Sequence, residues 1–344
     1  MTKVLTVDPK HPQPGAIDEA ARILQSGGLV AFPTETVYGL GANALDADAV
    51  AKIFTAKGRP SHDPLIVHLP TADDLPRVAR DIPALAYSLA AEFWPGPLTL
   101  VLPRQPHVPL AVSAGLETVA VRVPSHPVAQ ALIRAAGVPV AAPSANRFGH
   151  TSPTTAAHVL QDLYGRVDVV LDGGPANLGV ESTVLDISVT PARILRPGGV
   201  TREQLTAILG EVTLLNERMH EEKGLPSPGL LAKHYAPRAE MLLFSGGAAL
   251  AQMHTYLADL QAAGRTVGVM AADEDAEAFA AAGARVFHLG SASFLEEIAH
   301  NLYAAMRELD AAGVDVILCR DFGESGLGLA IRDRLSKAAT RVIR

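Results

Sequence analysis

The feature that most constrains the fold of this chain is a regular alternation of amphipathic helix patterns with short apolar strand patterns. Residues 16–25 have helical spacing that stops at two glycines, and residues 29–32 follow as a strand. Asp46 can cap a helix that runs to about Lys57. Such alternation is typical of an α/β fold, in which helices cover the faces of a sheet. Further strands are expected at residues 65–69, 98–102, 119–123, 138–142, 167–171 and 183–187.

The alternation lapses near the middle of the chain and then resumes. Residues 216–238 contain three prolines, few apolar residues and no clear period, which indicates an arm between domains. Strands expected at 241–244, 266–270, 285–289 and 314–319 alternate with helices, as in a small, open, mostly parallel sheet. A chain of 344 residues exceeds one ordinary core. We expect a catalytic domain over 13–210, a linker arm over 211–238 and a smaller domain over 239–344.

Composition and charge exclude several classes of protein. No apolar run approaches the ~20 residues that span a bilayer, and the start of the chain does not resemble a signal peptide. A single cysteine, Cys319, excludes an intrachain disulfide and a cysteine-rich metal site. We therefore expect a cytoplasmic protein with no membrane partner. The net charge of −7 argues against tight nucleic-acid binding, which usually requires a basic surface.

A lysine interrupts the apolar stripe of the helix that follows Asp46. Val50, Ile53 and Lys57 share one face by their spacing, and Arg59 follows after a glycine. Two cations at a helix end are suited to a polyanion. Alternatively, Lys57 extends toward solvent and offsets the helix dipole. The pattern leaves both interpretations open.

Two polar segments follow the strand expected at 138–142. Ser144 and Asn146 stand among small residues, where ligands approach the carboxyl ends of strands, although such a segment also makes an ordinary turn. Ser152 precedes Pro153, which predicts a helix start with free N–H groups that can hold phosphate oxygens. Most N-caps serve only their own helix.

Arg122 is the one cation in an otherwise apolar strand pattern, with valines on the alternate face. If the strand is half-solvated, the arginine is ordinary. If the strand is covered on both sides, Arg122 needs an anionic partner, and a substrate carboxylate fits its bidentate fork. The sequence contains no Walker, HExxH or GxSxG motif, so any ATP site is not a Walker site.

Several motifs taken in order resemble the Sua5/YrdC family. The Lys-x-Arg and later Ser-x-Asn motifs are the characteristic pair of this family, and the match covers nearly the whole chain. The second half is similar to the longer Sua5 type through Ser227-Pro228-Gly229 and His234-Tyr235-Ala236-Pro237. The N-terminal motifs are Pro33–Gly41, Lys57-Gly58-Arg59-Pro60, Pro64–His68, Pro143-Ser144-Ala145-Asn146, Glu181-Ser182-Thr183-Val184 and Leu195-Arg196-Pro197-Gly198.

This resemblance implies a catalytic domain with a twisted sheet around a concave basic cavity, and a Rossmann-like C-terminal domain. It implies L-threonylcarbamoyladenylate synthase activity, in which L-threonine, bicarbonate or CO2, and ATP give threonylcarbamoyl-AMP and pyrophosphate. The product is used to modify adenosine 37 of tRNAs that read codons beginning with A. Transient hand-over to the tRNA threonylcarbamoyl transferase is expected. Mg²⁺ is expected mainly on the ATP phosphates, with no protein metal site.

The resemblance also assigns roles to residues. Lys57 and Arg59 are the expected catalytic cations, and alanine at either position is expected to abolish pyrophosphate release while leaving the fold intact. The threonine site is expected at Thr34, His68, Arg122, Ala142 and Ser182. The ATP site is expected at Lys57, Ser61, Thr118, Ser144, Asn146, Ser152, Arg196 and Tyr235.

Three alternatives to this function remain open from the sequence. A carbamoyltransferase of hydrogenase maturation also contains a YrdC-like domain, but it carries zinc-binding modules that one cysteine cannot supply. An RNA-binding or ribosome-associated module would use the basic cavity, against the acidic balance of the chain. A nucleotide-binding α/β protein without threonine specificity is the third.

Overall fold

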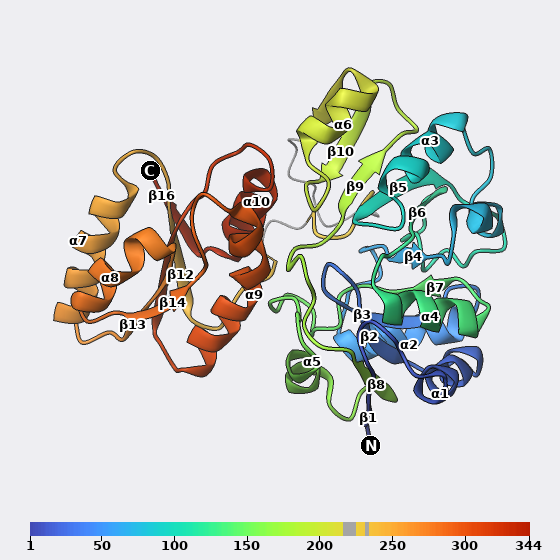
Figure 1. The fold of residues 1–344 in the computed structure, drawn as a ribbon, viewed down its shortest axis with the longest axis horizontal. Coiled ribbons are helices and arrows are strands. Elements are labelled where there is room, and N and C mark those ends of the chain that lie inside the picture. Colours follow the sequence, from blue (N-terminus) through green and yellow to red (C-terminus); the bar gives the residue numbers. More distant parts are fainter. Residues whose placement is uncertain (216–224, 231–233) are drawn as a thin grey trace. The chain divides into compact units, whose positions relative to one another are not determined.

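The computed structural model describes residues 1–215, 225–230 and 234–344. The chain divides into two compact units, coloured by sequence in Figure 1. The N-terminal unit comprises Met1–Phe148, Ser152–Asn177 and Glu181–Leu231. The C-terminal unit comprises Gly149–Thr151, Leu178–Val180 and Ala232–Arg344.

The described part of the N-terminal unit contains an eleven-stranded sheet in the order β1-β8-β2-β3-β7-β4-β6-β5-β9-β10-β11. Its strands are β1 Lys3–Thr6, β2 Val30–Pro33, β3 Tyr38–Asn43, β4 Ile66–His68, β5 Leu98–Pro103, β6 Thr118–Arg122, β7 Val140–Ala141, β8 Val169–Asp172, β9 Thr183–Asp186, β10 Ala192–Arg196 and β11 Val212–Leu214. Its helices are α1 Pro14–Gln25, α2 Ala47–Lys57, the short η1 Ala72–Arg77, α3 Ala84–Phe93, α4 Pro127–Ala136, α5 Ala156–Leu163 and α6 Arg202–Leu209.

Two of the hydrophobic cores of this unit lie on opposite faces of the sheet, and a third, minor cluster lies among β4, β5, β6, β9 and β10. The larger core joins α2, α3, α5 and α6 to one face, through residues such as Ile53, Leu89 and Val121. The smaller core places α1 and α4 on the opposite face of β2, β7 and β8, through residues such as Leu24 and Leu132. Successive side chains of a strand point to opposite faces of the sheet. The register of each strand therefore determines which of its residues lie on the face away from the larger core.

Local signals explain several helix boundaries. Asp46 caps α2 by accepting from the N–H groups of Asp48 and Ala49, as the sequence predicts, and Gly58 ends the helix with a positive φ. The capping box predicted at Thr201 and Gln204 opens α6. The strand β11 lies inside the segment 211–238, whose role as an arm stays a prediction; parts of that segment lie outside the described residues.

The helix predicted to start at Ser152 and Pro153 starts later, so that prediction was wrong. Thr155 is the N-cap of α5, and its side chain accepts from the N–H of His158. Ser152 is fully buried, and its hydroxyl donates to Glu181 Oε1 at 2.7 Å. Ser152 and Thr155 are both residue types that cap helices. Because the Ser152 hydroxyl is buried against Glu181, Thr155 forms the N-cap.

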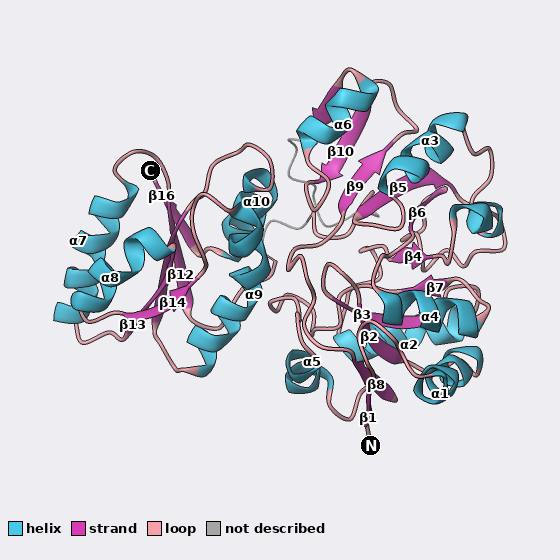
Figure 2. Ribbon diagram, in the orientation of Figure 1, coloured by secondary structure: helices cyan, strands magenta, loops and turns pink. Residues whose placement is uncertain are grey.

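The C-terminal unit has a parallel sheet of five described strands in the order β14-β13-β15-β12-β16, as expected for a Rossmann-like domain. Figure 2 shows α7 and α8 on one face and α9 and α10 on the other. The elements are β12 Glu240–Phe244, α7 Ala249–Ala262, β13 Val267–Ala271, α8 Asp273–Ala281, β14 Arg285–His288, α9 Leu295–Ala311, β15 Val316–Arg320, α10 Gly328–Ala338 and β16 Arg341–Ile343. No helix in the described ranges has the length and apolar character needed to cross a membrane.

Candidate functional site

A row of side chains crosses the middle of the N-terminal sheet on the face opposite the larger core. His68 of β4 pairs with Val140 on one side and with Arg122 of β6 on the other. Thr99 of β5 pairs with Val184 of β9. The next residues along these strands, Val67, Val121, Leu100 and Leu185, point into the larger core. Strand register therefore brings polar groups from separate parts of the sequence onto one surface.

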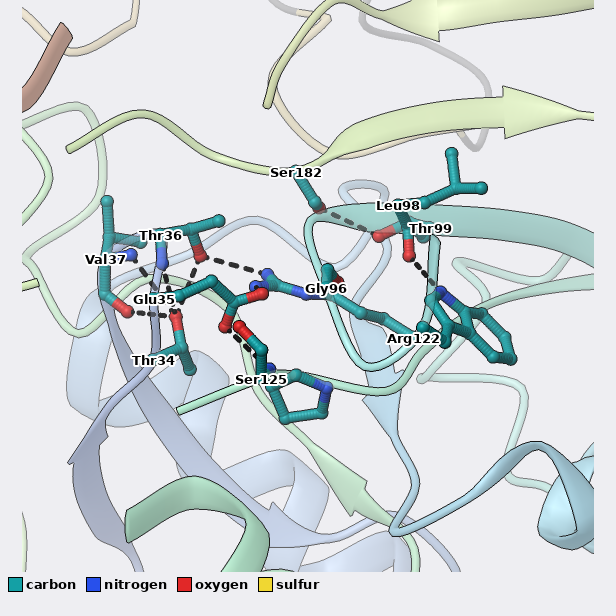
Figure 3. Close-up of polar contacts among 12 residues, drawn as sticks. Thr34, Glu35, Thr36, Val37, Gly96, Leu98, Thr99, Arg122, Ser125 and Ser182 are labelled. Carbon is teal, nitrogen blue, oxygen red and sulfur yellow. Dashed lines mark hydrogen bonds and ion pairs between the residues drawn. The ribbon is translucent and has the colours of Figure 1, made fainter. Parts of the chain in front are cut away.

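Arg122 is almost fully buried, so its strand is covered on both sides and the residue needs an anionic partner. That partner is Glu35, whose Oε1 lies 2.6 Å from Arg122 Nη2 (Figure 3). Arg122 also donates from Nη1 to Thr36 Oγ1 at 3.0 Å and from Nε to the carbonyl of Gly96 at 3.2 Å. The sequence reasoning missed Glu35, although it stands between two threonines directly after β2.

Two further residues of this region are Thr34, whose hydroxyl is held by hydrogen bonds, and His68, whose ring is uncharged. The Thr34 hydroxyl donates to the Val37 carbonyl at 2.6 Å, and it accepts from the Thr36 and Val37 N–H groups (Figure 3). His68 Nδ1 lies 3.2 Å from the Ile66 carbonyl. Burial, assisted by the charge of Arg122, lowers the pKa of His68 to about 3. His68 is therefore neutral at physiological pH and adds no charge to the row.

Ser182 connects this row to Arg196. The hydroxyls of Ser182 and Thr99 lie 2.8 Å apart (Figure 3). Arg196 Nη2 donates to the Ser182 carbonyl at 2.9 Å and to its hydroxyl at 3.2 Å. Gly198 is required nearby, because a Cβ there would lie 2.3 Å from the Glu181 carbonyl oxygen. Two segments from different strands thus meet in direct backbone contact.

Lys57 joins the two motifs that are characteristic of the family. It is only 3% exposed, and its Nζ donates to the carbonyls of Ser144 and Asn146, both at 2.6 Å. A third contact runs to Asn146 Oδ1 at 3.4 Å, and Ser144 Oγ donates to the same oxygen. Lys57 therefore does not extend toward solvent. Burial, then the charge of Arg59, hold the pKa of Lys57 well below its usual range.

Arg59 forms a buried ion pair with Asp63. Its Nη2 lies 3.0 Å from Asp63 Oδ2, and it donates to the carbonyls of Asp63 and Pro64 at 3.1 and 2.7 Å. Burial raises the pKa of Asp63, while the positive charges of Arg59 and Lys57 oppose this shift. The expectation that alanine at Arg59 leaves the fold intact does not agree with these contacts, because a buried carboxylate would lose its cation.

Three further residues expected in the site, Ala142, Ser61 and Thr118, lie at different distances from the polar row. Ala142 adjoins the row, since its N–H donates to the Ile66 carbonyl at 2.9 Å. Ser61 is exposed. Thr118 begins β6, four residues before Arg122, so the two lie roughly 13 Å apart along the strand.

Tyr235 belongs to the C-terminal unit. Its ring lies 5.6 Å from that of Tyr303 and 4.0 Å from that of His234, and the Arg334 guanidinium lies 5.3 Å from its centroid. Within the described ranges, no group of three or more His, Cys, Asp or Glu residues is arranged to hold a metal ion.

Two family models match consecutive parts of the chain. A family model described as "Telomere recombination", covering Sua5, YciO and YrdC proteins, matches residues 22–198. A second model, described as the C-terminal domain of threonylcarbamoyl-AMP synthase, matches residues 200–340.

Full-length relatives match across both units. A threonylcarbamoyl-AMP synthase of Pyrococcus abyssi is 45% identical over 93% of each chain. One from Bacillus subtilis is 46% identical over 95% of this chain and 94% of its own. The crystal structure of P. abyssi Sua5 complexed with L-threonine superimposes with a TM-score of 0.91, at 43% identity over 99% of each chain. Because both models and these relatives span nearly the whole sequence, the chain belongs to the Sua5/YrdC family and is of its Sua5 type.

Proposed function

We propose that this protein is an L-threonylcarbamoyladenylate synthase. It condenses L-threonine, bicarbonate or CO2, and ATP into threonylcarbamoyl-AMP and pyrophosphate. Relatives that are 45% and 46% identical over nearly their full length carry the name threonylcarbamoyl-AMP synthase, and the similar Sua5 structure is a complex with L-threonine. The product serves the threonylcarbamoyl modification of adenosine 37 in tRNAs that read codons beginning with A, in the cytoplasm.

The observation that carries this proposal is the polar row on one face of the sheet. Arg122 is a buried cation suited to a carboxylate, and neutral His68 lies next to it in register. Ser182 and Ala142 adjoin the row directly, and Thr34 is joined to Arg122 through the hydroxyl of Thr36. The proposed threonine site consists of Thr34, His68, Arg122, Ala142 and Ser182, with Arg122 facing the α-carboxylate.

The proposed ATP site uses the segments that Lys57 and Arg196 hold together. Lys57 fixes the loop that carries Ser144 and Asn146, and Arg196 is hydrogen-bonded to Ser182 of the threonine site. The bond between Arg196 and Ser182 supports an adenylate half adjacent to the threonine half. The proposed ATP contacts are Lys57, Ser61, Thr118, Ser144, Asn146, Ser152, Arg196 and Tyr235.

The proposed mechanism needs no covalent enzyme intermediate. The ammonium group of bound threonine first loses a proton to solvent. The neutral amine then forms a C–N bond to CO2, and a second proton leaves to solvent. A carbamate oxygen then attacks the α-phosphorus of ATP, and the bond to the β-phosphate oxygen breaks as pyrophosphate leaves. Lys57 and Arg59 contribute positive charge near the phosphates, so catalysis is positioning with electrostatic stabilisation. Mg²⁺ enters as part of the ATP substrate, because it retains waters and binds mainly through phosphate oxygens.

The organisation around this site is also proposed. We assign residues 13–210 to catalysis, 211–238 to a linker arm and 239–344 to the C-terminal domain. The intermediate is transferred transiently to the tRNA threonylcarbamoyl transferase, and no tight binding of nucleic acid is involved.

A pyrophosphate-release assay with ATP and bicarbonate tests the function. Release should depend on L-threonine, should fall when serine replaces it, and should vanish without an amino acid. Mass spectrometry should detect threonylcarbamoyl-AMP in the threonine reaction only. Pyrophosphate release that is indifferent to the amino acid would instead indicate a nucleotide-binding protein without threonine specificity.

A further inference from the structure

Glu35 and Arg122 are a buried ion pair with unused hydrogen-bonding capacity. Their charged atoms lie 2.6 Å apart, and the side chains are only 10% and 4% exposed. Among the residues that the structure describes, however, neither Glu35 Oε1 nor Arg122 Nη2 forms a hydrogen bond. The other oxygen of Glu35, Oε2, accepts from the N–H of Ser125 at 3.1 Å (Figure 3). At 2.6 Å the closest atoms of the pair are in charge-assisted contact, but without the alignment of a hydrogen bond.

Unmade hydrogen bonds of this kind are costly inside a protein. Buried polar atoms are nearly always bonded, and an exception calls for a specific explanation. A buried ion pair stabilises a fold only if further hydrogen bonds satisfy its remaining donors and acceptors. Here the donor nitrogen and the acceptor oxygen contact each other as an ion pair, and neither has an aligned hydrogen bond to a described residue. A bound molecule that supplies one acceptor and one donor at neighbouring positions would complete the pair.

An α-amino acid has this pattern, since its carboxylate and its amine are attached to one carbon. We infer that Glu35 binds the α-amino group of the amino-acid substrate, while Arg122 binds the α-carboxylate. The inference deepens the proposed function and rests on it. Glu35 is thereby a specificity-determining residue, which selects amino acids over carboxylic acids that lack the amine.

The net charge of the site supports this selection. Neutral His68 adds no charge, so the negative charge of Glu35 balances the positive charge of Arg122. A simple carboxylate bound at Arg122 would lie close to the carboxylate of Glu35 and be repelled. In a zwitterionic amino acid, the ammonium group offsets that repulsion. The backbone contact from Ser125 and the adjoining Thr36 contact to Arg122 keep both side chains in place.

The decisive experiment compares two ligands on the full-length Glu35→Gln variant by calorimetric titration. L-threonine carries the amine, and 3-hydroxybutyrate is the same skeleton without it. We expect Glu35→Gln to bind L-threonine at least about tenfold more weakly, because hydrogen bonds to charged groups contribute that much. We expect 3-hydroxybutyrate to bind at least as tightly as it does to the wild type. The preference for threonine therefore falls by about tenfold or more.

Controls separate this role from a structural one and from the proposed function itself. Glu92→Gln removes an exposed carboxylate from α3 and should change neither affinity. Glu35→Asp keeps the charge and should retain part of the preference, which also covers the case that Glu35→Gln fails to fold. If the variants lose affinity for L-threonine and for 3-hydroxybutyrate by the same factor, the inference is wrong. Absence of threonine-dependent turnover in the wild type would instead refute the proposed function.

Discussion

Replacement of Arg59 by alanine tests whether the buried pair with Asp63 holds the loop after α2. The Asp63 side chain is fully buried, and its carboxylate lies 3.0 Å from Arg59 Nη2. Arg59 also donates to the carbonyls of Asp63 and Pro64. The variant loses these contacts together and leaves a buried carboxylate without its ion-pair partner.

The expected loss of unfolding free energy follows from these contacts. Removing one partner of a buried ion pair costs about 3–5 kcal/mol. For a domain of this size, each kcal/mol lowers the melting temperature by about 2–4 °C, which gives a decrease of roughly 6–20 °C. Arg202→Ala, at an exposed arginine of α6, is the matched control and should melt within about 2 °C of the wild type.

The pH dependence of this loss has a definite sign. Burial raises the pKa of Asp63, and Arg59 is the largest effect that opposes this shift, so its removal raises that pKa further. When folding raises the pKa of a carboxyl group, protonation stabilises the folded state. This contribution is complete below the pKa of the unfolded chain, about 3.9, and is lost as pH rises through the pKa of the folded protein. The difference in melting temperature between wild type and Arg59→Ala should therefore narrow as pH falls from 8 to 5.

Differential scanning calorimetry of the full chain measures these effects on the transition of the N-terminal unit. The double variant Arg59→Ala, Asp63→Ala should be more stable than Arg59→Ala alone at pH 8, because the unpaired charge is gone. If the double variant is no more stable, or if the difference widens on acidification, the buried carboxylate is not the cause and the reasoning is wrong.

Four further predictions follow from the site. Lys57→Met leaves two loop carbonyls without their donor. It should lower the free energy of unfolding by about 2–5 kcal/mol in urea and abolish pyrophosphate release. A variant as stable as the wild type would contradict the contacts of Lys57. The ring signals of His68 in NMR spectra should not titrate between pH 5 and 8, and because its pKa is lowered on folding, its contribution to stability should be lost only as pH falls below about 6.5. Thr155→Ala removes the cap of α5 and should cost about 1 kcal/mol in the same unfolding assay; no measurable change would contradict the cap assignment. Gly198→Ala should prevent soluble expression or reduce threonine binding sharply, since its Cβ would collide with the backbone beside Ser182, and a normal variant would show that this backbone can shift.

Much of the architecture was predictable because local patterns decide it. The alternation of helix and strand periods indicated an α/β fold, and the parallel order in the C-terminal unit agrees with that reading. The cap at Asp46 and the capping box at Thr201 depend on residues within three positions, so the sequence reveals them directly. Ser152 and Thr155 could each cap a helix by local pattern. The sequence could not show which of them does, because the burial of Ser152 depends on the tertiary structure.

The sequence by itself determined which residue types were available and, through their motifs, the family. It did not reveal that Glu35 is the anionic partner of Arg122, because 87 positions separate them and only the folded chain brings them together. It also left open whether Lys57 is solvated or buried. Tertiary structure decided both points, since a charge inside a folded protein must find its partner wherever packing of distant segments places one.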